Sequence, residues 1–71
     1  METLTIKIGK LPGRITEVVL EQGATVAQAI EVAEISGLEG FETRVNGAPA
    51  TLETTLSDGD NVLLVKKIKG N

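Results

Sequence analysis

The sequence predicts an α+β fold in which one helix packs across one face of a mixed sheet of four to five strands. Apolar and polar residues alternate near both ends of the chain and again in its middle, which is the pattern of half-buried strands. Only the segment after Gly23 places its apolar residues three and four positions apart, as an amphipathic helix does. A chain of 71 residues has room for one domain. We therefore expect a single domain over residues 1–71, with residues 67–71 forming a flexible tail.

The first two strands are expected to form a hairpin. The first strand carries an apolar residue at every second position: Leu4, Ile6 and Ile8. The loop GKLPGR (residues 9–14) leads into RITEVVL (residues 14–20), the second strand. The two faces of this second strand carry Thr16, Val18 and Leu20 on one side, and Ile15, Glu17 and Val19 on the other.

A single helix is expected to begin at Thr25. Thr25 and Gln28 have the spacing of a capping box, in which each side chain satisfies a free backbone N–H. Ser36-Gly37 is expected to end the helix, with Gly37 in the left-handed conformation and Leu38 packing back onto it. The apolar stripe of this helix consists of Val26, Ala29, Ile30 and Ala33.

The second half of the chain is expected to supply the remaining strands. FETRV (residues 41–45) alternates and precedes Asn46-Gly47, a strong hairpin signal because both residues tolerate positive φ. The return segment is a short edge strand, since Pro49 has no N–H for a central ladder. Leu52 and Leu56 are expected to be buried. The order strand, strand, helix, strand, short strand, strand is that of a β-grasp fold.

The last strand, NVLLVKKI (residues 61–68), predicts an exposed apolar surface. It is apolar on both faces from Val62 to Val65, but a single helix can cover only one face of the sheet. We therefore expect Leu63 and Val65 on the uncovered face, beside Ile15 and Val19. Exposed aliphatic patches of this kind usually bind another protein.

The second half of the chain resembles the ThiS/MoaD group of ubiquitin-related sulfur carriers. The residues that carry the resemblance are VNG at 45–47, TLSDGDNV at 55–62 and the end Lys69-Gly70-Asn71; GATVAQAI, at the helix start, is also similar. In that family the tail ends in Gly-Gly, and its terminal carboxylate is adenylated by an activating enzyme and converted to a thiocarboxylate. Glycine suits this chemistry because it has no side chain to obstruct a narrow channel. Gly70 falls on the first of the two glycines, and Asn71 stands in place of the last.

Two functions remain open on these residues. The first is a sulfur carrier or ubiquitin-like modifier that an adenylating enzyme activates at the tail residues Lys69, Gly70 and Asn71. The second is a non-covalent interaction module with an inert tail. Both use the same predicted partner-binding face, formed by Leu11, Ile15, Val19, Leu63, Val65 and Lys67. Leu11 is included because ubiquitin also carries a leucine of its binding patch in this loop.

The composition argues against other classes of function. The chain has no histidine and no cysteine, so we expect no catalytic residues, no metal site and no cofactor. A net charge of −3 and a single aromatic residue argue against nucleic-acid binding. Asp58-Gly59-Asp60 is interpreted as a turn, since the other ligands of a calcium loop are missing. No apolar stretch is long enough for a signal peptide or a membrane span, so a cytoplasmic monomer with no membrane partner is expected.

Overall fold

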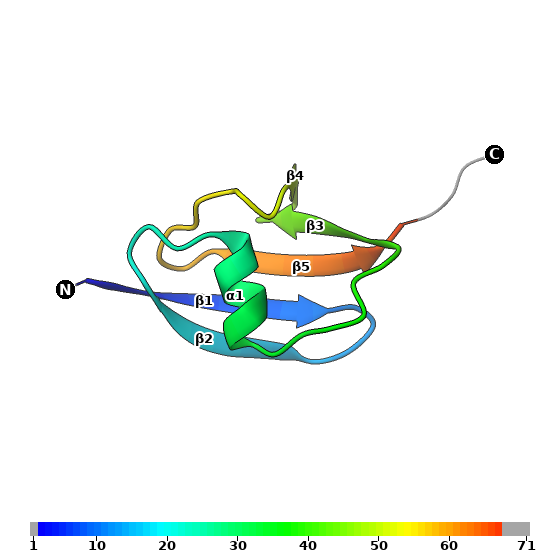
Figure 1. Ribbon diagram of the computed structural model, residues 1–71, viewed down its shortest axis with the longest axis horizontal. Coiled ribbons are helices and arrows are strands. Elements are labelled where there is room, and N and C mark those ends of the chain that lie inside the picture. Colours follow the sequence, from blue (N-terminus) through cyan, green and yellow to red (C-terminus); the bar gives the residue numbers. More distant parts are fainter. Residues whose placement is uncertain (1, 68–71) are drawn as a thin grey trace.

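The computed structural model describes residues 2–67, and over these residues it contains a five-stranded mixed sheet with one helix. The strands are β1 (Thr3–Lys10), β2 (Ile15–Glu21), β3 (Phe41–Val45), β4 (Ala48–Ala50) and β5 (Asn61–Lys66). The helix is α1 (Val26–Val32), and it crosses one face of the sheet (Figure 1). The strand order is β2-β1-β5-β3-β4, with β1 and β5 parallel and the other pairs antiparallel. The predicted fold class and order of elements are confirmed.

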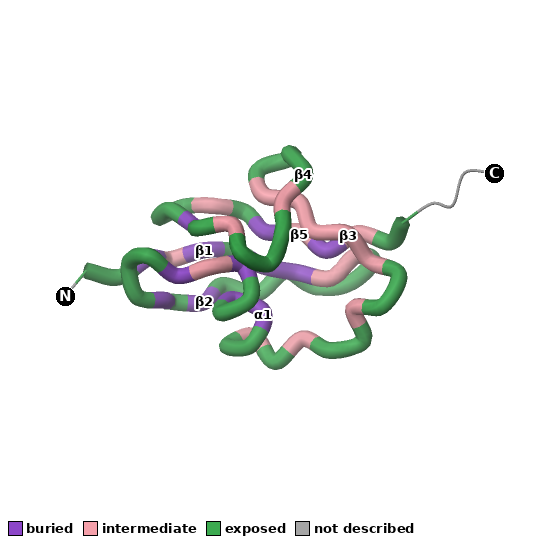
Figure 2. The backbone as a smooth tube through the Cα atoms, turned by 45° about the horizontal axis from the view of Figure 1, so that its top comes forward, coloured by how far each residue is buried: buried purple, intermediate pink, exposed green. Residues whose placement is uncertain are grey.

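The core lies between the sheet and α1. β5 is the middle strand, and its Val62 and Leu64 are almost fully buried beneath the helix. Figure 2 shows the buried positions gathered along β1, β5 and the inner side of α1. The buried residues are Leu4, Ile6, Ile8, Val18, Leu20, Ala24, Val26, Ala29, Ile30, Leu56, Val62 and Leu64. They include the apolar faces predicted for both N-terminal strands and most of the predicted helical stripe, of which Ala33 is half-buried.

The start of α1 is held by the segment that precedes β5. The backbone N–H of Thr25 donates to Gln28 Oε1 at 2.9 Å, as the capping box predicts. The next two N–H groups, of Val26 and Ala27, donate to the carbonyl oxygens of Thr54 and Leu52, each at 3.0 Å. Leu52 therefore contributes its backbone and not its side chain, which is 50% exposed. The prediction that Leu52 is buried is wrong, whereas Leu56 is buried as expected.

The helix ends earlier than the sequence predicts. Its last residue is Val32, and the left-handed position is taken by Glu34 (φ 58°) instead of Gly37. The N–H of Glu34 bonds to Glu31 O at 3.1 Å and the N–H of Ile35 to Ile30 O at 3.2 Å, which together form a Schellman motif. The chain turns here because Ile35 then packs against the core. Gly37 does have positive φ (69°), but it lies in the connection to β3.

The two polar turns of the C-terminal half form one hydrogen-bonded unit. Asn46 bonds through its amide nitrogen to Asp60 Oδ1 at 2.9 Å and accepts the N–H of Asn61 on its amide oxygen at 3.0 Å. Asp60 Oδ2 accepts the N–H of Ser57, and Asp58 Oδ1 accepts the N–H of Thr5, both at 2.7 Å. Both carboxylates thus tie the turn to its neighbours, which supports the interpretation of Asp58-Gly59-Asp60 as a turn.

Candidate protein-binding face

The side of the sheet away from α1, here called the open face, has no other layer of the described chain against it. Side chains alternate along each strand, so the neighbours of the buried Val62 and Leu64 point to this side. Leu63 and Val65 are accordingly half-buried on the open face, as predicted. Ile15, which also points there, is 53% exposed.

Ile15 and Leu63 meet across a glycine. Gly9 pairs with Ile15 on one side and with Leu63 on the other, so the three residues form one row across the sheet. A Cβ at position 9 would lie 2.9 Å from Ile15 Cγ1, which shows that the Ile15 side chain leans over the glycine. Ile15 and Leu63 line the same hollow of the open face, together with Lys7, Asn46, Gly47 and Asn61. The glycine therefore allows two aliphatic residues on strands that are not neighbours to form one apolar surface.

Leu11 and Val65 extend this surface toward the C-terminal end of β5. Lys10 pairs with Leu64, and the N–H of Leu11 donates to Leu64 O at 2.8 Å. The continued register places Leu11 next to Val65, and both residues are half-buried. We name Leu11, Ile15, Leu63 and Val65 together the aliphatic row.

Val19 does not belong to the aliphatic row. It pairs with Thr5 near the start of β1, whereas β5 begins opposite Lys7. Glu17 also lies between Val19 and Ile15 on the same face of β2. Val19 is 60% exposed, but it lies at the outer edge of the sheet, away from Leu63 and Val65. The prediction that Val19 lies beside Leu63 and Val65 is therefore wrong, because β5 does not extend to the end of the sheet where Val19 lies.

Charged side chains border the aliphatic row. Arg44 pairs with Leu63 in the register of β3 and β5, and Glu42 pairs with Val65. Arg44 Nε and Glu42 Oε2 form an ion pair at 2.8 Å, with each side chain more than one third exposed. Such a half-exposed pair contributes little to stability, and its position at the rim of an apolar surface is typical of protein interfaces.

The end of β5 is fixed beside the aliphatic row. Lys67, which is exposed, donates its backbone N–H to Gly40 O at 2.8 Å. The connection that contains Gly40 is itself held by Lys10, whose Nζ donates to Ser36 O at 3.0 Å and lies 4.8 Å from the centre of the Phe41 ring. The chain thus leaves the sheet at a defined place. The predicted tail residues Lys69, Gly70 and Asn71 lie outside the described residues.

The described residues contain neither a cluster of metal-ligating side chains nor a helix that could span a membrane. Over residues 2–67 no three carboxylates, histidines or cysteines come together in a way that could hold a metal ion. In the same part of the chain, no helix has both the length and the apolar character needed to cross a membrane.

A model of the ThiS family matches residues 8–70. The chain belongs to the ThiS family. This is a family of ubiquitin-like carrier proteins, which act with protein partners and are not enzymes. The prediction of a non-catalytic protein is therefore confirmed. None of the curated protein sequences compared with the chain matches it.

Solved structures of other small proteins are similar to this chain in fold. Small archaeal modifier protein 1 from Haloferax volcanii is similar with a TM-score of 0.75 and 16% identity, over 92% of this chain and 99% of that one. A second crystal structure of that modifier protein gives a TM-score of 0.69 and 18% identity, over 99% and 100% of the chains. Caldiarchaeum subterraneum ubiquitin gives 0.64 and 18%, again over 99% and 100%. At these identities the likeness establishes the ubiquitin-like β-grasp fold alone.

Sequence reasoning missed three residues that shape the open face, or the connection beside it, in this ThiS-family protein. Gly9 lets Ile15 approach Leu63, and a glycine inside a strand pattern is a known sign of such a close approach. Arg44 lies beside Leu63 only through the register of β3 and β5, and no local pattern in the sequence predicts that pairing. Lys10 braces the connection to β3 through contacts with residues 26 and more positions away, which no local pattern predicts.

Proposed function

We propose that this ThiS-family protein is a small sulfur carrier or ubiquitin-like modifier that acts through its C-terminal segment. An adenylating enzyme recognises it on the open face. The observation that carries the proposal is the uncovered aliphatic row, which ends beside the place where the chain leaves β5. A partner seated on Leu63 and Val65 holds the residues that follow Lys67 close to its own surface.

The chemistry follows from the resemblance to the family. A terminal carboxylate oxygen attacks the α-phosphorus of ATP and pyrophosphate leaves; a sulfur donor then displaces AMP to give the thiocarboxylate. The chain has no histidine or cysteine with which to catalyse either step, so the partner supplies the catalytic groups. The need for ATP and for such an enzyme supports a cytoplasmic location, and we propose that the protein acts there as a monomer.

Co-expression with an adenylating enzyme from the same genome tests this function. We expect an intact mass in which one oxygen is replaced by sulfur, or the mass of a conjugate. Leu63→Asp should abolish the modified species, because it puts a charge into the contact surface. Leu52→Asp is the matched control, since Leu52 is equally aliphatic and 50% exposed but lies outside the open face. If only the unmodified mass appears with every adenylating enzyme of that genome, the carrier function is wrong.

A second function is favoured by Asn71, which stands where the family pattern has its last glycine. In this alternative the protein is a non-covalent interaction module that uses the same open face. Deletion of residues 69–71 should then leave partner binding intact, whereas Leu63→Asp abolishes it. Asn71→Gly separates the two functions: it should raise the yield of modified protein for a carrier and have no effect on a module. Loss of binding on deletion alone would contradict the module.

A further inference from the structure

β2 has a free edge that carries no proline or bulge and that no other strand of the described residues covers. Its pairing with β1 runs without a bulge from Glu21 to Ile15. Gln22 donates its backbone N–H to Glu2 O and so points its backbone groups toward β1. In an antiparallel strand every second residue points its backbone groups to the same side, so the even-numbered residues of β2 also face β1. The residues between therefore direct theirs outward, where residues 2–67 supply no further strand. These residues are Ile15, Glu17, Val19 and Glu21. The carbonyl oxygen of Glu21 already accepts the N–H of Ala24 at 3.0 Å, so both outward groups are available only at Ile15, Glu17 and Val19.

The other edge of the sheet is protected by comparison. β4 has only three residues, and Pro49 lies at its centre. Short strands and prolines are the usual means by which proteins prevent edge pairing. β2 has seven residues and contains no proline, glycine or lysine. One edge of the sheet is thus closed and the other is open.

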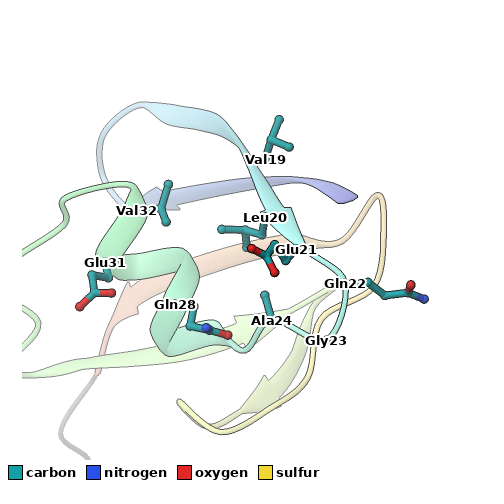
Figure 3. A pocket seen from close by; sticks show the side chains of 9 residues that line it. All are labelled: Val19, Leu20, Glu21, Gln22, Gly23, Ala24, Gln28, Glu31 and Val32. Atoms are coloured by element: carbon teal, nitrogen blue, oxygen red, sulfur yellow. The ribbon is translucent and has the colours of Figure 1, made fainter. Parts of the chain in front are cut away.

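A groove runs between this open edge and α1. Its walls are the residues Val19 to Ala24 on one side and Gln28, Glu31 and Val32 of α1 on the other (Figure 3). Val32 is 52% exposed although it lies on the helix beside the sheet, and Val19 is 60% exposed at the strand edge. Val19 points away from α1, so the two valines offer apolar contact on opposite sides of the edge.

The groove and the outward residues of β2 carry only acidic charges, although Lys7 of β1 pairs with Glu17 from the other side of β2. Along the outer face of β2, aliphatic and acidic residues alternate as Ile15, Glu17, Val19 and Glu21. Glu31 adds a third carboxylate from α1, and none of the residues that line the groove is basic. A strand placed next to β2 would therefore be favoured by basic residues opposite Glu17 and Glu21 and by aliphatic residues opposite Val19.

We propose that the β2 edge binds an extended segment of a partner protein in which aliphatic residues alternate with lysine or arginine. The segment adds a further strand to the sheet through backbone hydrogen bonds to Glu17 and Val19 and to the N–H of Glu21, whose carbonyl oxygen is already bonded to Ala24. Side chains on one face pair with those of β2, and side chains on the other face enter the groove and contact Val32 and Glu31. This site is separate from the aliphatic row and does not depend on the C-terminal chemistry.

A second copy of this chain fits the edge less well. Two copies of β2 could pair antiparallel along their free edges. Their outward backbone groups meet only if the centre of the pairing lies at Glu17, Val18 or Val19. Centring on Glu17 places it against itself, and centring on Val19 places Glu17 against Glu21. Like charges directly opposite each other are unfavourable. Centring on Val18 avoids this, because it places Glu17 against Val19 and Ile15 against Glu21, but it pairs neither carboxylate with a cation. A strand that carries basic residues is therefore the better match for this edge.

The test uses the full-length, ¹⁵N-labelled protein and a synthetic peptide in which lysine and valine alternate over about seven residues, a typical strand length. We expect amide shifts at Glu17, Val19, Glu21 and Val32, and slower amide exchange at Val19. A peptide with glutamate in place of lysine is the matched control and should not bind. Shifts centred on Leu63 and Val65, or equal binding of the acidic peptide, would overturn the proposal.

Two variants examine the backbone and the charges separately. Val19→Pro removes an outward N–H without removing a bond to β1, so the protein should fold but lose the peptide. Glu17→Lys with Glu21→Lys should weaken binding at least about tenfold, whereas Glu39→Lys with Glu53→Lys gives the same change in net charge away from the groove and should not. Unchanged affinity in the Glu17 and Glu21 variant, or a dimer on size-exclusion chromatography without peptide, would overturn the proposal.

Discussion

Gly9 determines the shape of the open face at the scale of one residue. A Cβ at this position would lie 2.7 Å from the carbonyl oxygen of Arg14 and 2.9 Å from Ile15 Cγ1. The first of these contacts is with backbone, which cannot move aside without disturbing the β1–β2 connection. Glycine is therefore required here for close approach and not for backbone conformation.

Gly9→Ala should destabilise the protein by about 1–3 kcal/mol, the usual cost of adding a methyl group where there is no room. It should also displace Ile15 from Leu63 and weaken binding to any partner of the open face. Urea denaturation measures the first effect, and the amide shifts of Ile15 and Leu63 report the second. Unchanged stability would show that the Arg14 carbonyl moves freely.

Glu34 is the reverse case of Gly9: it has a side chain at a position where the backbone conformation favours glycine. Its φ of 58° ends α1 in the left-handed conformation. Glu34→Gly should raise the free energy of unfolding by about 1 kcal/mol, since the Cβ penalty is removed. For a chain this small, the melting temperature should rise by about 4–8 °C. Glu34→Ala keeps the Cβ and should give no comparable rise; an equal rise would contradict the explanation.

At the scale of an element, β5 has two faces with different tasks. Leu64 is 1% exposed beneath α1, whereas its neighbour Leu63 is half-buried on the open face. Two adjacent leucines therefore have different roles: Leu64 packs in the core, and Leu63 is available for contact at the surface. The strand is apolar from Val62 to Val65 because core packing and surface contact both need aliphatic side chains.

Leu64→Ala should cost about 2–5 kcal/mol, since it opens a cavity in the core. A core of this size supplies roughly 3–5 kcal/mol in total, so this variant should be largely unfolded. Leu63→Ala should cost about 1 kcal/mol or less, because solvent already reaches the side chain. Circular dichroism with urea denaturation compares the two, and equal losses would contradict the assignment of faces.

At the scale of the whole molecule, the sheet offers two separate binding regions. The aliphatic row lies over β1 and β5, and the acidic edge groove lies along β2 and α1. Glu17 and the length of β1 separate Val19 from Leu63. The two regions could therefore serve two partners at once.

This separation predicts that a substitution in one binding region leaves the function of the other region unchanged. Leu63→Asp should abolish modification by the adenylating enzyme and leave binding of the basic peptide unchanged. Val19→Pro should abolish peptide binding and leave modification unchanged. Intact-mass measurement and NMR titration on the same preparations compare the two. Loss of both activities in either folded variant would show that the regions form one site.

Much of the fold could be predicted because each element carries its own local signal. The alternation in β1 and β2, the capping box at Thr25 and the turn at Asn46-Gly47 are each specified within a few residues. The end of α1 was placed too late, because Gly37 is the obvious residue for a left-handed cap. The packing of Ile35 against the core moved that cap to Glu34, and packing is not visible in a local pattern.

The candidate site was predicted only in part for the same reason. Alternation in β5 placed Leu63 and Val65 on the uncovered face, since one helix cannot cover both sides of a sheet. Their true neighbours depend on strand register, which brought Ile15 and Arg44 to Leu63 and left Val19 at the edge. A surface assembled from separate strands is defined by their pairing.

The sequence by itself determined the type and order of the elements, the uncovered aliphatic face and the resemblance to the ThiS family, because periodicity and turn residues act over short distances. Only the tertiary structure decided that Gly9 joins Ile15 to Leu63, that Leu52 stays exposed and that the β2 edge remains open. These features arise from contacts between residues far apart in the chain, where register and packing outweigh local preference.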